Sequence, residues 1–418
     1  MFEFIKNKDN HPFLRFWLAQ LVSQFGDRVH QMALVGLIAA RSPGSSFELA
    51  KLLAFTIIPV FLIGPIAGVY VDRWDRRRTL FICDFVRGLL VLSIAFYFMH
   101  LPSVLPLYAL VFVIFGFSRF YVPAKMSFIP EMVKDSQLHI ANSLVSVTGM
   151  VALVLGALFG GMIVEKAGAQ GGFFWDAVTF FASGLLVFSI IPKNKPWNFD
   201  KDRIVTTGRE MLIVHKTVWG EIVEGIRYIR SQKDIQFIFV MMSILFAAGG
   251  AIYVVIIVFI QNAFGTVTRD LGFLAVPLGG GLFLGSLSYG KWGSRFSKWR
   301  AIFWSLILGG LVLGCFAATV HTTHNRSLAA GLAFVLGFVV GPVAIASNTV
   351  IHKVCSAQMS GKVFSALEFV MHLAFLAAML LSSWAAEYVS RAWILGTVGV
   401  IFFAVGVIGV MSYKDSDA

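Results

Sequence analysis

Long apolar stretches recur along the whole chain, and short polar connections separate them. A membrane hydrocarbon core about 30 Å thick needs about 20 apolar residues in a helix, and the stretches reach that length. Pro123 and Pro130 break the pattern between the fourth and fifth stretches. We predict twelve spans, over residues 13–40, 50–71, 79–100, 104–125, 141–164, 172–192, 235–261, 270–290, 300–320, 327–351, 362–387 and 392–412.

Composition supports an all-α integral membrane protein. Hydrophobic residues make up 58% of the 418 residues, charged residues only 13%, and the mean hydropathy is +0.80. A soluble domain carries about 25% charged residues, so this chain cannot build a water-soluble surface. The apolar run from Phe13 to Ala40 has no small-residue cleavage site and is predicted to be a retained first span rather than a signal peptide.

The net charge of +12 does not indicate nucleic-acid binding, because the basic residues gather in a few short connections without interleaved aromatic residues. Most of the 34 Lys and Arg residues fall in alternate connections, including 73–78 and 193–233. Basic residues favour the cytoplasmic side. We therefore predict a multi-pass protein with both termini in the cytoplasm.

The longest polar interruption divides the chain into two sets of six spans. We predict a six-helix bundle at 1–192, a cytoplasmic linker at 193–234 and a second six-helix bundle at 235–418. Ile222, Ile226 and Ile229 share one helical face of the linker, which indicates an interfacial helix. The segment from Gly68 to Arg78 has a degenerate counterpart from Gly290 to Arg300, and such a repeat favours two bundles related by an axis along the membrane normal.

The connection after the second span carries the motif Gly68-Val69-Tyr70-Val71-Asp72-Arg73-Trp74-Asp75-Arg76-Arg77. It resembles the G-x-x-x-D-R-x-G-R-R signature of the major facilitator superfamily, with Asp75 in place of the second glycine. The resemblance implies a twelve-helix transporter that works by alternating access. It also implies that Gly68, Asp72, Arg73, Arg76 and Arg77 form a latch that ties the two bundles together. A plain positive-inside loop would explain the arginines but not the spacing of Gly68 and Asp72.

Further stretches resemble the enterobactin and macrolide exporter branch of this superfamily, at residues 23–28, 138–143, 176–180 and 224–228. This resemblance implies proton-coupled efflux of an amphipathic small molecule, such as a siderophore, drug or metabolite, by a monomer in the bacterial inner membrane. Residues 156–161 are similar to an antiporter motif, but Ala157 stands where proline is expected. Close packing of two helices at small residues explains that segment equally well.

Polar residues within the spans are the candidate transport site, because charges in lipid are costly and face a cavity or one another. Gln20, Gln24, Asp27 and Gln31 lie on one face of the first span with Ser23 beside them, a stripe that should line a central cavity. Asp27 is our first choice for the coupling proton, with Arg28 and Arg119 as the available cations. A permanent Asp27–arginine pair that only holds helices together is the alternative.

Two pairs of residues and one single residue complete the set of candidates. Asp84 and Arg87 are three residues apart in the third span and are predicted to form an ion pair within the membrane. Glu368 and His372 are four apart in the eleventh span, where a structural and a coupling role are both open. Asp176 falls near the outer end of the sixth span, where partial hydration favours a role in anchoring a loop.

No signal for an enzyme is present: the chain has no Walker A loop, no G-x-S-x-G and no H-E-x-x-H. We expect no cofactor and no metal site, and a proton gradient as the energy source. A lysophospholipid or metal-ion transporter of the same fold and a membrane scaffold or sensor without transport activity are the alternatives. The polar stripe argues against the scaffold, and the substrate cannot be identified from the fold.

Overall fold

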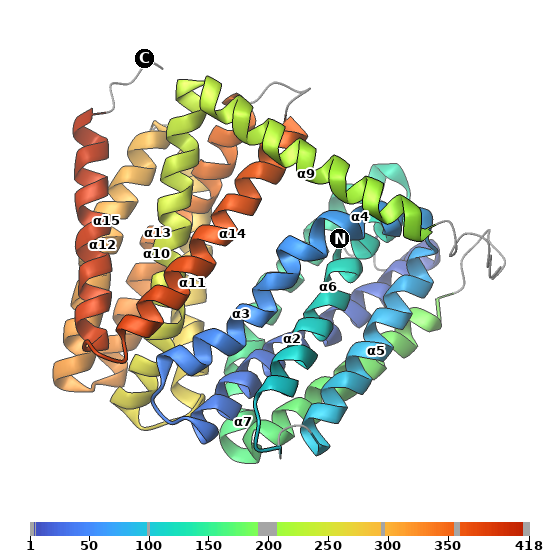
Figure 1. Cartoon of the computed structure of the whole chain (residues 1–418), viewed down its shortest axis with the longest axis horizontal. Helices are drawn as coiled ribbons and strands as arrows, with labels where there is room; N and C mark the ends of the chain where they lie inside the picture. Colours follow the sequence, from blue (N-terminus) through green and yellow to red (C-terminus); the bar gives the residue numbers. More distant parts are fainter. Residues whose placement is uncertain are drawn as a thin grey trace. The chain divides into compact units, whose positions relative to one another are not determined.

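The computed structural model describes residue 4 and residues 6–97, 101–190, 207–293, 297–354 and 360–412. Within these ranges every regular element is a helix, as Figure 1 shows. The helices pack as two compact units. Unit 1 comprises Met1–Leu37 with Leu52–Gly220, and unit 2 comprises Ile38–Lys51 with Glu221–Ala418.

Unit 1 is built mainly from long apolar helices. They are α2 (His11–Arg41), α3 (Ser46–Leu62), α4 (Gly64–Arg73), α5 (Arg76–Phe96), α6 (Leu105–Met132) and α7 (Leu138–Phe188), with short 3₁₀ turns η1 (Lys8–Asn10) and η3 (Asp135–Gln137). Helix α5 packs against α6 and α7, and α4 packs against α6. Phe13, Phe16, Leu80 and Phe128 belong to one buried apolar core of this unit.

Helix α7 contains two of the predicted spans. Gly168 interrupts its helical backbone with φ 68° and ψ 179°, a left-handed conformation that an L side chain rarely adopts. The position lies between the predicted spans 141–164 and 172–192. A glycine therefore makes the corner at which the chain turns from the fifth span into the sixth.

Proline has two different effects in unit 1. The predicted span 50–71 is divided at Ile63, and Pro65 lies in the first turn of α4, where its missing N–H costs no hydrogen bond. Helix α6, by contrast, continues through Pro123 and Pro130 to Met132. Our interpretation of these two residues as a break was wrong, because helix neighbours in a membrane protein can satisfy the carbonyls that a proline leaves free.

Unit 2 contains the helices from the linker to the end of the described chain. They are the last part of α9 (Thr207–Ser231), α10 (Lys233–Phe264), α11 (Arg269–Trp292), α12 (Lys298–Thr323), α13 (Arg326–Val354), α14 (Ser360–Ala385) and α15 (Arg391–Ser412). Figure 1 shows α12 beside α15 and α10 beside α14, and these pairs and α11 with α13 are in contact. On the apolar face of α9, Ile222 and Ile229 are buried and Ile226 is partly buried.

The α2–α3 connection belongs to unit 2 because polar contacts fasten it to the α14–α15 connection. Glu387 Oε1 accepts hydrogen bonds from the Phe47 N–H and the Ser45 hydroxyl, each at 3.0 Å. Arg391 Nε donates to Ser46 Oγ at 3.0 Å. The carboxylate therefore lies at the N-terminus of α3, where the helix dipole favours a negative charge.

Among the described residues, nine helices have the length and apolar composition to cross a membrane. Helix α7 counts once among these nine although Gly168 divides it into two spans. Helix α2 and the α3–α4 pair occupy the first two predicted spans. The fold is thus the predicted all-α arrangement of twelve transmembrane helices in two bundles.

Candidate functional site

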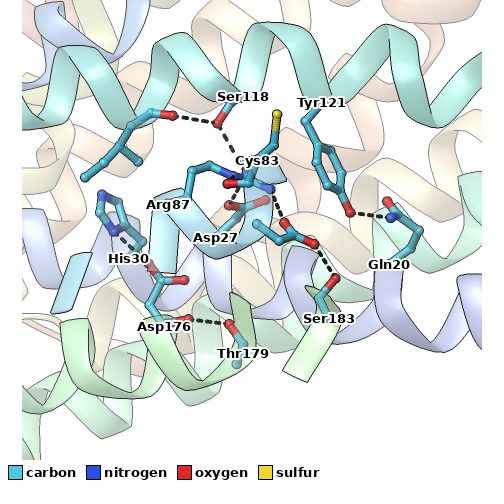
Figure 2. Close-up of polar contacts among 12 residues, drawn as sticks. Gln20, Asp27, His30, Cys83, Arg87, Ser118, Tyr121, Asp176, Thr179 and Ser183 are labelled. Atoms are coloured by element: carbon cyan, nitrogen blue, oxygen red, sulfur yellow. Dashed lines mark hydrogen bonds and ion pairs between the residues drawn. The ribbon is translucent and has the colours of Figure 1, made fainter. Parts of the chain in front are cut away.

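A cluster of polar side chains lies inside unit 1, and the guanidinium of Arg87 is its centre (Figure 2). Arg87 is only 2% exposed and forms an ion pair with Asp84, which is completely buried. Arg87 Nη1 also donates to the Ser118 hydroxyl of α6 at 3.3 Å, and Asp84 Oδ2 accepts from the Ser183 hydroxyl of α7 at 2.7 Å. The predicted pair of α5 thus connects three helices.

Asp27 of α2 adds a second carboxylate to Arg87. Its Oδ1 lies 3.7 Å from Arg87 Nη1, and its side chain is 44% exposed. The cation beside Asp27 is therefore Arg87 of α5. From the sequence we had expected Arg28 or Arg119 to be this cation. Arg28 instead donates to Gln31 Oε1 at 3.0 Å. One arginine thus faces one buried and one accessible carboxylate.

Aromatic rings enclose the guanidinium. Its central carbon lies 4.5 Å from the ring centre of Tyr121 and 4.3 Å from that of Phe180, within the range of cation–π attraction. The Tyr121 hydroxyl accepts a hydrogen bond from the amide of Gln20, which is almost fully buried. These contacts hold the Arg87 charge between α2, α6 and α7.

Small residues bring α2 close enough to α7 for these contacts. A Cβ at Gly26 would lie 2.9 Å from Thr179 Cβ, and one at Gly160 would lie 3.1 Å from Val29 Cα. Gly160 belongs to the segment that is similar to the antiporter motif. Gly160 of this segment therefore allows α7 to pack closely against α2.

His30 and Asp176 form a second polar pair one helical turn beyond Asp27 (Figure 2). Nδ1 of His30 lies 2.8 Å from Asp176 Oδ2, and the two side chains are 3% and 0% exposed. Our expectation of a partly hydrated Asp176 that anchors a loop was wrong. The close approach of α2 to the second half of α7 removes this carboxylate from water.

The other residues of the predicted α2 stripe do not share one environment. Ser23 is buried, whereas Gln24 is partly buried and faces Gly149 of α7. Gln20 and Asp27 both join the Arg87 cluster through the contacts described above. Arg119 is partly buried on α6, next to Ser118 in sequence.

The candidates on α14 belong to unit 2. His372 Nδ1 lies 2.8 Å from the backbone carbonyl of Glu368, and the Glu368 side chain is exposed. His372 therefore contacts the backbone of Glu368. The His372 ring also faces Phe246 of α10, with 6.2 Å between ring centres.

The arginines of the signature motif contact unit 1. Arg76 Nη1 lies 2.6 Å from Glu131 Oε1 at the end of α6, and Arg77 Nε donates to the Val187 carbonyl of α7 at 3.3 Å. Asp75 caps α5 by accepting from the Arg78 N–H at 2.8 Å, which explains an aspartate at this motif position. Gly68 is in α4 and Arg73 ends it. The Asp72 side chain lies outside the described part, so the latch between bundles stays a prediction.

Sequence reasoning did not identify several members of the cluster. Tyr121, Ser118 and Ser183 carry no charge and give no signal in an apolar helix. His30 did give a signal in the sequence, because it is an ionisable residue that follows Asp27 by three residues on the same face of α2.

Comparison with known proteins places these observations in a family. The model of the Major Facilitator Superfamily matches residues 16–378 and 239–418. YfiS, an MFS-type transporter of Bacillus subtilis (strain 168), is 22% identical over 96% of this chain and 93% of its own. BacE of the same strain, a candidate bacilysin exporter, is 23% identical over 73% of this chain and 71% of its own.

A solved structure shares the fold. The crystal structure of a bacterial homologue of the iron transporter ferroportin, in its inward-facing state, matches with a TM-score of 0.71. It is 12% identical, and the match covers 95% of this chain and 98% of that chain. Because the family model covers most of the chain, the chain belongs to the major facilitator superfamily of multi-pass membrane transporters.

Proposed function

We propose that this transporter exports an amphipathic small molecule in exchange for protons, and that Asp27 carries the coupling proton. One observation supports this proposal above the others. The accessible carboxylate of Asp27 lies 3.7 Å from a buried arginine that already has a buried carboxylate partner.

The two carboxylates differ in whether the charge of Arg87 already balances theirs. Asp84 and Arg87 together are neutral, and the Ser183 hydroxyl further stabilises the Asp84 anion. Asp27 adds a negative charge that this neutral pair does not balance, so the net charge at Asp27 depends on Lys125 of α6 and on its own proton. A proton on Asp27 removes that charge. Asp27 is also the more exposed carboxylate of the two and can exchange its proton with water.

Protonation changes the contact between two helices. Ionised Asp27 attracts Arg87 and holds α2 to α5, whereas protonated Asp27 loses the ionic part of that attraction. Lys125 of α6 is a second cation that acts electrostatically on Asp27. Proton binding and release would thereby bias the transporter between its two states.

The direction of transport is inferred from relatives. BacE is named as a bacilysin exporter candidate, and it spans 73% of this chain. The match to the ferroportin homologue, at 12% identity, supports the fold alone. Export of an amphipathic compound is therefore better supported than transport of a lipid or a metal ion.

The test uses purified protein in proteoliposomes with an imposed pH gradient. Erythromycin and ethidium serve as the first amphipathic probes of a wider panel. Asp27→Asn should remove accumulation driven by the gradient and retain exchange of labelled probe between the two sides. A well-folded Asp27→Asn protein that still accumulates the probe against its gradient would remove Asp27 from the mechanism.

Asp84→Asn is the matched control, because it makes the same chemical change on the other carboxylate of Arg87. We expect it to lower the yield and thermal stability of the protein, since it leaves the buried Arg87 without its closest anion. If Asp27→Asn lowered the thermal stability as much as Asp84→Asn does, the contact of Asp27 with Arg87 would instead have a purely structural role.

A further inference from the structure

The pair of His30 and Asp176 plays no part in the mechanism proposed for Asp27, although both of its members are titratable and lie within the membrane-spanning helices. His30 is in the middle of α2, and Asp176 lies eight residues beyond the Gly168 corner in the second half of α7. We propose that this pair is a second proton-binding site of the transporter, distinct from the site at Asp27. Its ligand is a single proton.

The hydrogen bond fixes the chemistry of the pair. When His30 Nδ1–H donates to an ionised Asp176, His30 is neutral and the pair carries one negative charge. When the pair binds one more proton, the imidazolium and the carboxylate cancel. Burial in a medium of low dielectric constant favours this neutral arrangement over the arrangement with net charge. The two groups titrate together, so the proton belongs to the pair.

The structure leaves an open position for that proton. Within the described chain, His30 Nε2 and Asp176 Oδ1 are buried and have no hydrogen-bond partner. A proton delivered by hydronium can form an N–H bond at Nε2, and the hydronium is left as a water molecule. Phe115 and Phe173 flank the His30 ring, with 5.8 and 5.4 Å between ring centres. These rings are close enough to stabilise a charged imidazole by cation–π attraction.

Other charges near the pair oppose one another. Asp27 of α2 and Arg87 of α5, which carry opposite charges, both act electrostatically on Asp176. Phe115 of α6 and Phe173 of α7 carry no charge.

The pair also occupies a different junction from the Arg87 cluster. It bridges α2 and α7, whereas the ion pair of Asp27 bridges α2 and α5. Both members are closed to water in this state, so a proton can enter or leave only when the packing of α2 against α7 changes or through a path along α2. This coupling of proton exchange to a conformational change rests on the proposed function, but binding of the proton does not.

The direct test is nitrogen NMR of the full-length protein in lipid with ¹⁵N-labelled histidine. The chain has nine histidines, and the signal that is lost in His30→Gln identifies His30. We expect the His30 signal to change from charged to neutral as the pH is raised from about 5 to about 9, a range around the ordinary titration of histidine. A His30 ring that stays neutral throughout this range would overturn the proposal.

Asp176→Asn is the second variant, because asparagine keeps the size and one hydrogen-bonding oxygen but cannot hold the anion. We expect the His30 ring to stay neutral over the whole range in this variant. The same variant assigns the signal if His30→Gln does not fold. A His30 ring that becomes charged equally well in Asp176→Asn would show that the pair is not the unit that binds the proton.

The transport consequence is measured separately, as the number of protons moved for each molecule of probe in proteoliposomes. His30→Gln should lower this number by one and retain coupling, whereas Asp27→Asn should abolish coupling. An unchanged number in folded His30→Gln would overturn the transport role of the second site. If the wild-type protein moved no protons, the proposed function would fail, but the NMR result would still decide whether the pair binds a proton.

Discussion

The two units bury different kinds of side chain. Unit 1 buries Asp84, Arg87, His30 and Asp176 in the middle of its helices. The buried acid of unit 2, within the described residues, is Asp270 in the first turn of α11, where Arg326 of α13 pairs with it at 3.1 Å. Ionisable groups in unit 1 are therefore shielded within the membrane-spanning helices, whereas this pair of unit 2 lies at helix ends.

Several glycines of unit 2 lie close to the backbone of a neighbouring helix. A Cβ at Gly285 of α11 would lie 2.9 Å from the Phe338 Cα of α13, and one at Gly341 of α13 would lie 2.9 Å from the Ser286 nitrogen. Such close approach of backbones is the usual means of packing helices in lipid, where apolar surface alone gives little driving force. The buried ionisable groups of unit 1 are the basis on which we propose that this unit carries the proton chemistry.

The largest effect on stability is expected for Arg87→Gln. This substitution leaves Asp84 buried without its cation, and breaking a buried pair in this way costs about 3–5 kcal/mol. We expect a large fall in folded yield and in the temperature of thermal unfolding in detergent. Arg326→Gln is the control in unit 2. Its guanidinium is 47% exposed, so a comparable loss there would contradict the contrast between the units.

A smaller effect is expected for Gly285→Val, which forces a side chain against the α13 backbone. Overpacking of this kind costs about 1–3 kcal/mol. Gly280→Val is the matched control, because a Cβ at Gly280 meets nothing within 4 Å. Thermal unfolding should show the loss in Gly285→Val alone. Proton coupling in the folded fraction should be unchanged, and a specific loss of coupling would assign proton chemistry to unit 2 as well.

The smallest effect is expected for Lys362→Gln. Its Nζ lies 2.7 Å from Glu224 Oε2 of α9, but both side chains are substantially exposed. Exposed ion pairs contribute about 0–1 kcal/mol. Thermal unfolding in low salt should therefore change little, and less still in high salt. A fall as large as that of Gly285→Val would show that the contact of α9 with α14 is more important than its exposure indicates.

The sequence was sufficient to predict the spans because length and hydropathy decide whether a helix can cross a membrane. It also predicted the Asp84–Arg87 pair, since residues three apart share a helix face. The division at Ile63 and the continuation of α6 through its prolines depend on neighbouring helices, which a local pattern does not contain. Placement of Arg87 beside Asp27 depends in the same way on how α5 packs against α2.

The most direct measurement compares two single substitutions, Asp27→Asn in unit 1 and Glu368→Gln in unit 2. Each removes one ionisable carboxylate from a span while keeping its size. Proton movement is followed with a pH-sensitive dye inside proteoliposomes while the amphipathic probe is added outside. The account predicts that proton movement disappears in Asp27→Asn and persists in Glu368→Gln. Proton movement that persists in a folded Asp27→Asn protein and disappears in Glu368→Gln would contradict this account and place the coupling proton in unit 2.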